Sequence, residues 1–128
     1  MATAPKTKEQ VGRAARNKGA RGERQVRDIF RAFGFETVRR GHVFDHESDV
    51  IGAPGIHIEV KYQKTAKIWK WIGQAETEAK IKNDGQPVIW FRKDFEPWRV
   101  IVPAKLFMEM YEAWYREQIK DIGGTEDE

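Results

Sequence analysis

The 128-residue sequence contains no cysteine, and this absence excludes several kinds of site. Without thiols there is no disulfide framework, no thiolate zinc site and no cysteine nucleophile. No apolar run approaches the ~18 residues of a transmembrane helix, and Met1 to Lys18 lack the apolar stretch of a secretory signal. We therefore expect a soluble protein without membrane association, located in the cytoplasm, or in the host cytoplasm if it comes from a phage.

The composition supports one folded domain. At 40% hydrophobic residues, with 7 Phe, 5 Trp and 3 Tyr, the chain can bury a core, which argues against wholesale disorder. A chain of this length is enough for one compact domain and too short for two ordinary ones.

The positive charge is concentrated at one end of the chain. Residues 1–40 hold 11 Lys and Arg against 4 Asp and Glu, whereas residues 106–128 hold 2 against 7. A basic end can neutralise phosphates and release counterions, so nucleic acid is a partner to test. A solubilising tail explains the same charge, and both interpretations remain open at this point.

The predicted domain lies between two short ends. Residues 1–16 are small and basic without an apolar period, which predicts a flexible basic arm. Residues 17–122 form the single predicted domain, and residues 123–128 form a frayed acidic tail. The first helix is expected to begin at Asn17, which can cap it, and to end at Gly34. Its apolar residues recur at helical spacing: Val26, Ile29, Phe30 and Phe33.

The remaining sequence alternates between strand and helix patterns. Short β-rich runs bounded by turn residues predict strands at 37–40, 49–51, 56–62, 88–92 and 99–102. Apolar stripes predict helices over 68–82 and from Pro103 to about Lys120, since proline is tolerated in the first turn. The order α-β-β-β-α-β-β-α predicts an α/β fold, with a central mixed sheet flanked by helices.

Chemically capable side chains gather on one predicted strand. Strand alternation places His57, Glu59 and Lys61 on one face of a half-buried strand, a pattern that a solvent-facing edge strand shares. Asp49 lies at the head of the preceding strand. An odd number of connecting residues would place Asp49 opposite Glu59, with Cβ atoms about 4.5–5.5 Å apart, and an even number would not. Pro54 in the turn favours a bulge or a five-residue link.

At this short distance, the two carboxylates would repel each other by about 4 kcal/mol at an effective dielectric near 20. A protein relieves this repulsion by raising one pKa or by binding a cation. Oxygen ligands with open positions suit Mg²⁺ or Mn²⁺. Lys61 could hold or deprotonate an attacking water, or form a salt bridge to either acid.

Glu23 is the third candidate acid. On the first helix it shares a stripe with Val26 and Phe30, so it lies on or beside the core-facing side. A glutamate there is costly unless it is paired or linked to a metal. It can also be an acid near the N-terminus of the helix, where the dipole favours it.

These residues resemble the PD-(D/E)XK nuclease motif. The acids Glu23, Asp49 and Glu59 and then Lys61 stand at its spacing, and residues 18–24 with 33–35 are similar to archaeal-type Holliday junction resolvases. The resemblance covers roughly residues 17–105. It implies a restriction-endonuclease-like αβββαβ core, here followed by an extra C-terminal helix. It also implies a homodimer with two Mg²⁺-dependent sites, Mn²⁺ as a possible substitute, and paired phosphodiester hydrolysis in four-way DNA junctions.

The resemblance assigns a role to each site residue. Asp49, Glu59 and the Val60 carbonyl would bind the metal, Glu23 would reach it directly or through water, and Lys61 would activate the water. Two accessory residues are Ser48, in place of the motif's proline and able to contact the scissile phosphate, and Gln74, which resembles a family glutamine or is simply solvated. His57 could touch DNA or be a tolerated strand residue. The expected DNA-binding residues are basic: Arg13, Arg16, Lys18, Arg21, Arg24, Lys64, Lys67 and Lys70.

Other functions remain open on the sequence alone. The same motif serves restriction-type and repair nucleases that act on duplex or nicked DNA. The acids could also be structural in a non-catalytic DNA-binding module.

The last predicted helix has a wide apolar face. Its members are Leu106, Phe107, Met110, Tyr111, Trp114 and Ile119. We expect core packing to cover at least half of this face, and a dimer contact to cover part of it.

Overall fold

The computed structural model describes residues 4–121, and its first helix starts earlier than the sequence predicts. Helix α1 spans Lys8–Ala32. Thr7 caps it: its side chain accepts from the Gln10 main-chain N–H (3.1 Å), and the Gln10 side chain accepts from the Thr7 N–H (2.9 Å). The predicted start at Asn17 is therefore wrong, and the predicted arm is helical from Lys8 onward. This capping box, followed by good helix formers, is the signal that we missed.

A five-stranded mixed sheet forms the centre of the molecule, which confirms the predicted fold class. Its order is β1-β2-β3-β4-β5. Strands β3 and β4 are parallel and joined through helix α2, and the other neighbours are antiparallel. The elements are β1 (Arg39–Arg40), the 3₁₀ turn η1 (Val43–Asp45), β2 (Val50–Ile51), β3 (Ile56–Tyr62), α2 (Ile68–Lys82), β4 (Gln86–Arg92) and β5 (Arg99–Ile101).

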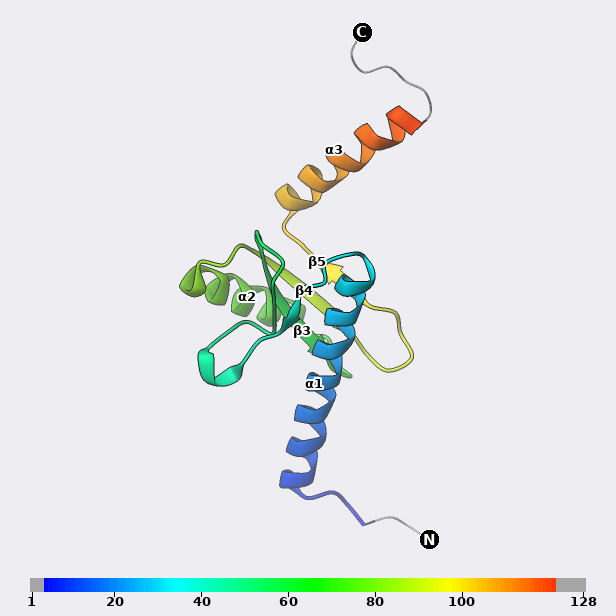
Figure 1. Ribbon diagram of the computed structural model, residues 1–128. Coiled ribbons are helices and arrows are strands. Elements are labelled where there is room, and N and C mark those ends of the chain that lie inside the picture. The colour runs from blue at the N-terminus through cyan, green and yellow to red at the C-terminus, as the bar shows by residue number, and fades with distance from the viewer. Residues whose placement is uncertain (1–3, 122–128) are drawn as a thin grey trace.

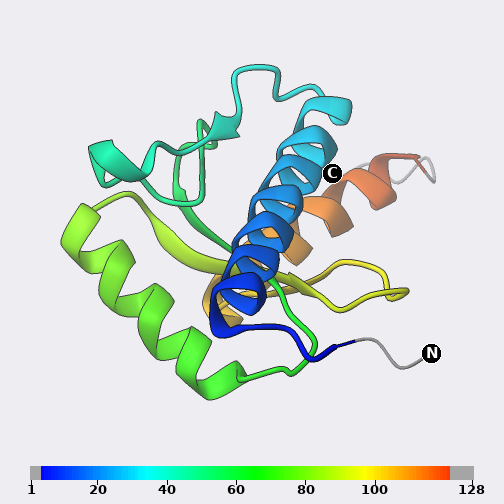
Figure 2. The same cartoon turned by 90° about the horizontal axis from the view of Figure 1, so that it is seen from below.

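Helices α1 and α2 cover opposite faces of this sheet (Figures 1 and 2). On one face, Val26 of α1 is fully buried against Val50 and Ile58. On the other, Trp71 and Ala75 of α2 pack against Ile89 of β4. Because alternate residues of a strand point to opposite faces, β3 directs Ile58 toward α1 and its neighbours toward the α2 side. β3 is therefore a central strand buried on both faces.

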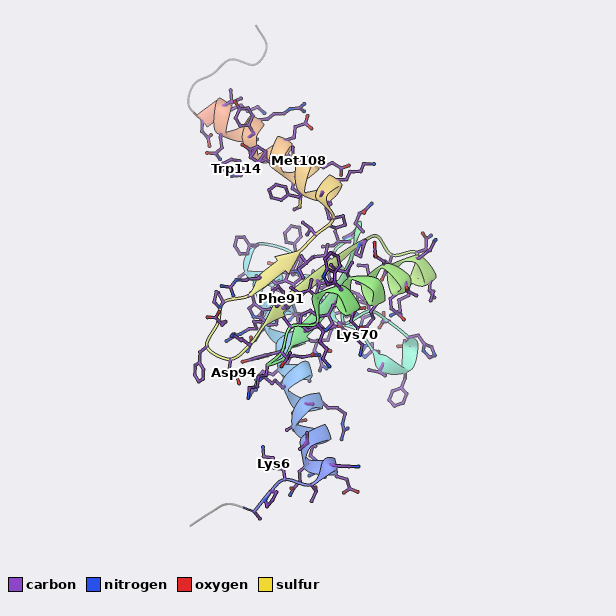
Figure 3. All side chains as sticks on the ribbon, turned by 180° about the vertical axis from the view of Figure 1, so that it is seen from behind. Lys6, Lys70, Phe91, Asp94, Met108 and Trp114 are labelled. Carbon is purple, nitrogen blue, oxygen red and sulfur yellow. The ribbon has the colours of Figure 1, made fainter. Side chains whose placement is uncertain are left out.

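Helix α3 (Ala104–Asp121) extends away from the sheet (Figure 1), and none of its described residues is buried. Figure 3 shows Met108 and Trp114 clear of the rest of the molecule. The expectation that core packing covers at least half of its apolar face is therefore wrong, because the chain leaves the sheet at Pro103. Among the described residues, no helix is both long and apolar enough to span a membrane.

Candidate active site

The register of β2 and β3 brings the two predicted acids together. Val50 pairs with Ile58, so the next residues outward, Asp49 and Glu59, face each other. In this register residue 51 lies opposite residue 57. Residues 52–56 then connect the two strands, which is the five-residue link that we predicted. Asp49 Oδ2 also accepts a hydrogen bond from the Val60 main-chain N–H (2.8 Å). The antiparallel pair thus holds both carboxylates on one face of the sheet.

This acidic pair is buried more deeply than the sequence suggests. Glu59 is only 6% exposed and His57 is 0% exposed, although we predicted a half-buried strand with an open polar face. The prediction is wrong because β3 lies in the centre of the sheet, between β2 and β4, with α2 over this face.

The pKa values of Asp49 and Glu59 are shifted in opposite directions. Burial and, to a smaller extent, the negative charge of Glu59 together raise the pKa of Asp49 to about 7. Burial also acts to raise the pKa of Glu59, but the hydrogen bonds to His57 and Asp49 and the positive charges of His57 and Lys61 together outweigh it, so the pKa of Glu59 is lowered. Near neutral pH, Glu59 is ionised and Asp49 lies close to its titration point.

Glu23 extends from α1 to the edge of this site. Its Oε1 accepts from Arg40 through Nε (3.1 Å) and forms an ion pair with the second guanidinium nitrogen at 3.0 Å. Burial raises the pKa of Glu23, the bond to Arg40 acts against that rise, and the charge of Glu59 adds to it. The structure therefore brings Glu23 within electrostatic reach of the acidic pair, with its carboxylate held by Arg40.

Lys61 and Gln74 meet on the α2 side of the sheet. Lys61 follows Glu59 on the same face of β3, and its Nζ donates to Gln74 Oε1 (3.0 Å). Both residues were predicted as site residues, and the structure places them in contact. The amide of Gln74 thus restricts where the ammonium group can lie.

A buried polar network lies behind Glu59. Ser48 Oγ donates to Asp84 Oδ2 (2.6 Å), and His57 contacts Asp84 through Nδ1 (2.8 Å) and Glu59 through Nε2 (2.9 Å). Burial acts to lower the pKa of His57, but the hydrogen bonds to the two carboxylates outweigh it and the pKa is raised. Because Ser48 is 3% exposed and its hydroxyl faces Asp84, it is turned away from any phosphate on the surface.

This network corrects one interpretation of the sequence, the role of His57, and contains one residue that the sequence analysis missed, Asp84. His57 is fully buried, so the suggestion that it touches DNA is wrong. Asp84 was missed entirely, because it lies in a turn 25 residues after Glu59 and belongs to no motif. The Asn83-Asp84-Gly85 turn was the only signal, and it indicates a turn without indicating a site.

A basic groove is lined by residues of α1, of β3 and of the β3–α2 connection. It has a volume of about 510 Å³, and Val60 forms part of its wall together with Lys18, Lys64 and Lys67. Tyr62 lies at the same place, with the Lys18 ammonium 4.8 Å from its ring centre. The structure therefore brings predicted DNA-binding residues of α1 next to those of the β3–α2 connection. The others lie exposed along α1 and at the start of α2: Arg13, Arg16, Arg21, Arg24 and Lys70.

Comparison with known proteins assigns the chain to a family. The family model "Archaeal holliday junction resolvase (hjc)" matches residues 14–123. The chain belongs to this family. No curated protein and no solved structure matches it. Members of the Hjc family are metal-dependent endonucleases that bind four-way DNA junctions and resolve them by cutting, and this is the function of the chain.

The donor set of this resolvase fits a hard divalent cation. Asp49 and Glu59 supply opposed carboxylates, one with a pKa raised to about 7 by burial and by the other's charge. Residues 4–121 contain no group of three or more His, Asp or Glu side chains arranged to hold a metal ion. Glu23 is ion-paired with Arg40 through Oε1, and Asp49 and Glu59 are the two acids that the β2–β3 register brings together.

Proposed function

We propose that Asp49, Glu59 and the Val60 main-chain carbonyl bind Mg²⁺, for which Mn²⁺ can substitute. The observation that carries this proposal is the pairing of Asp49 with Glu59 in the β2–β3 register, which sets a buried carboxylate beside a partly buried one. When bound there, the cation offsets negative charge on the scissile phosphate and makes a bound water more acidic.

In this proposal the other site residues act on the water and the phosphate. Lys61 lies on the same face as Glu59, so its ammonium orients the attacking water or stabilises charge that develops on the phosphate. Gln74 keeps that ammonium in place through the 3.0 Å hydrogen bond. Glu23 contributes through a bridging water, because Arg40 holds its carboxylate.

The basic groove binds the DNA backbone. Lys18, Lys64 and Lys67 line it together with Val60, the residue after Glu59 in β3, so a DNA strand that follows these cations reaches the strand that carries Glu59. Arg13, Arg16, Arg21 and Arg24 extend the positive surface along α1, and Lys70 extends it along α2. Contacts of this kind position the strand without reading its sequence.

A cleavage assay tests the assignment of the site. Wild-type protein with Mg²⁺ is expected to cut a labelled four-way junction in preference to a linear duplex of the same sequence. Glu59→Gln and Asp49→Asn are expected to abolish cutting and retain binding to the junction. Glu36→Gln, at an exposed position outside the site, serves as the matched control and should cut normally.

One result would contradict the assignment of the metal ligands, and another would contradict the expected preference for junctions. If Glu59→Gln cuts at the wild-type rate, Glu59 is not a metal ligand. If the wild type cuts the linear duplex at the same rate as the junction, the expected preference for four-way junctions over duplex DNA is wrong.

We also propose that the resolvase acts as a homodimer and that α3 forms the contact between the two copies. Cutting two strands of one junction in a paired manner requires two sites related by a two-fold axis. Helix α3 offers a row of aromatic rings without a described partner surface. Tyr111 lies 6.3 Å from Phe107 and 5.8 Å from Trp114 between ring centres, and each is between 42% and 58% exposed. An apolar face of this width is typical of an interface.

Analytical ultracentrifugation tests the dimer. Wild-type protein should sediment as a dimer, and Trp114→Glu should shift it to a monomer. Arg116→Ala, on the same helix and exposed, is the matched control. A Trp114→Glu variant that remains dimeric would show that α3 is not the interface.

A further inference from the structure

Asp84 and His57 form a hydrogen-bonded chain that ends on Glu59. Asp84 Oδ1 lies 2.8 Å from His57 Nδ1, and His57 Nε2 lies 2.9 Å from Glu59 Oε1. The imidazole is fully buried and Glu59 nearly so, which shields the contact between His57 and Glu59 from water, whereas the Asp84 side chain is 32% exposed. The chain thus connects a residue of the α2–β4 turn to an acid of the active site.

The turn that carries Asp84 is firmly held. Asn83 before it has a φ of 50°, and Gly85 after it has a φ of 126°. A Cβ on Gly85 would lie 2.3 Å from the carbonyl carbon of Gly55, so the turn packs directly on the β2–β3 link. The Gln86 N–H also donates to the Gly55 carbonyl (2.9 Å). Asp84 therefore has a fixed position relative to β3.

Ser48 adds a second restraint on the same carboxylate. Its hydroxyl donates to Asp84 Oδ2 at 2.6 Å, so both oxygens of Asp84 are engaged. Ser48 directly precedes Asp49 in the chain. The network therefore touches both strands that carry the acidic pair.

The consequence for Glu59 is a loss of rotational freedom. A histidine nitrogen that faces a carboxylate oxygen must carry a hydrogen in order to bond to it, and His57 faces such oxygens at both nitrogens. With Oε1 of Glu59 committed to His57, its carboxylate cannot turn freely. Its second oxygen is then presented in a defined direction.

We propose that Asp84 and His57 are positioning residues that orient the carboxylate of Glu59 for metal binding. This inference rests on the proposed role of Glu59 as a metal ligand. Groups that hold a ligand in this way typically change metal affinity about 10- to 100-fold when they are removed. The residue to substitute is Asp84, because it lies in a turn and touches the acidic pair only through His57 and Ser48.

Titration of the full-length protein with Mn²⁺, followed by electron paramagnetic resonance of the free ion, measures this effect without DNA or cleavage. Asp84→Ala is expected to raise the dissociation constant for Mn²⁺ by about 10- to 100-fold. Asp84→Asn should lose less, since its amide oxygen still accepts from His57. Asp28→Ala, at an exposed position on α1, is the matched control and should bind as the wild type does.

The same titration separates positioning from a merely structural role. A variant that is partly unfolded would bind fewer Mn²⁺ ions per chain at an unchanged dissociation constant. A folded variant with a misplaced Glu59 would keep the number of sites and bind each ion more weakly. If Asp84→Ala does not fold, the comparison of Asp84→Asn with the wild type decides in the same way.

The outcomes distinguish this inference from the proposed function. If Asp84→Ala and Asp84→Asn bind Mn²⁺ with wild-type affinity while Glu59→Gln does not, the positioning role is refuted and the metal site stands. A lower site number at constant affinity also refutes it. If the wild type does not bind Mn²⁺, the proposed function fails, and the inference fails with it.

Discussion

Replacing Asp49 with Asn should stabilise the metal-free protein at pH 8, and the gain should shrink toward pH 5. Burial and the charge of Glu59 raise the pKa of Asp49 from 3.8 to about 7, so the ionised carboxylate costs folding free energy. The amide of Asn carries no charge, and its oxygen can still accept from the Val60 N–H. The substitution therefore removes the repulsion and keeps the hydrogen bond.

The size of the effect follows from the pKa difference. A carboxyl group whose pKa is higher in the folded state binds protons more tightly there, so its stabilising contribution is present at low pH and lost as the pH rises through about 7. A shift of about 3 units corresponds to roughly 4 kcal/mol at 1.36 kcal/mol per unit. About 3 kcal/mol of this falls between pH 5 and pH 8. Comparison with Asp49→Asn measures the contribution of Asp49 together with its interactions with Glu59 and Glu23.

Urea unfolding followed by tryptophan fluorescence measures this difference. The wild type, Asp49→Asn and the exposed control Asp45→Asn are compared in EDTA at pH 5, 6.5 and 8. We expect Asp49→Asn to exceed the wild type in unfolding free energy at pH 8 and the difference to fall steadily with pH. A difference that does not change with pH, or a variant less stable than the wild type at pH 8, would refute the electrostatic argument.

Three further predictions concern the proposed catalytic role of Lys61, the basic groove and the turn that carries Asp84. Lys61→Ala should lower kcat for junction cutting by about 100-fold or more in single-turnover assays, with junction affinity unchanged, because one group stabilising developing charge has about this effect. Lys67→Ala should reduce the slope of log affinity against log salt concentration by about 1, measured by fluorescence anisotropy, whereas Lys80→Ala should leave the slope unchanged. Gly85→Ala should lower the free energy of urea unfolding by at least about 1 kcal/mol, since the residue has a φ of 126° and its Cβ would clash with Gly55. Unchanged kcat, an unchanged salt slope or unchanged stability would contradict the respective argument.

Local patterns predicted most of the fold. The β-rich runs and their turn residues gave the strands, and the apolar stripe of residues 68–82 gave α2 with both bounds correct. The site acids could be paired from the sequence because side-chain direction in a strand has a period of two. A connection with an odd number of residues between the two strands was therefore enough to place Asp49 opposite Glu59.

The missed features depend on contacts between distant parts of the chain. Asp84 approaches His57 only because the α2–β4 turn packs on Gly55, and no spacing in the sequence records that contact. The burial of His57 follows from the central position of β3, which alternation along one strand cannot show. The start of α1 was a different kind of error, since Thr7 and Gln10 carried a readable capping signal.

The carboxylates of the candidate site differ in their hydrogen-bond and ion-pair partners. Glu23 is paired with Arg40, and His57 lies between Glu59 and Asp84 with a hydrogen bond to each. Within residues 4–121, Asp49 is the one carboxylate of this site whose hydrogen bonds and ion pairs include no cationic side chain. Its raised pKa has the same cause, because burial and Glu59 both oppose its ionisation. A divalent ion at Asp49 would remove that opposition, so metal binding and the ionisation of Asp49 should be one coupled event.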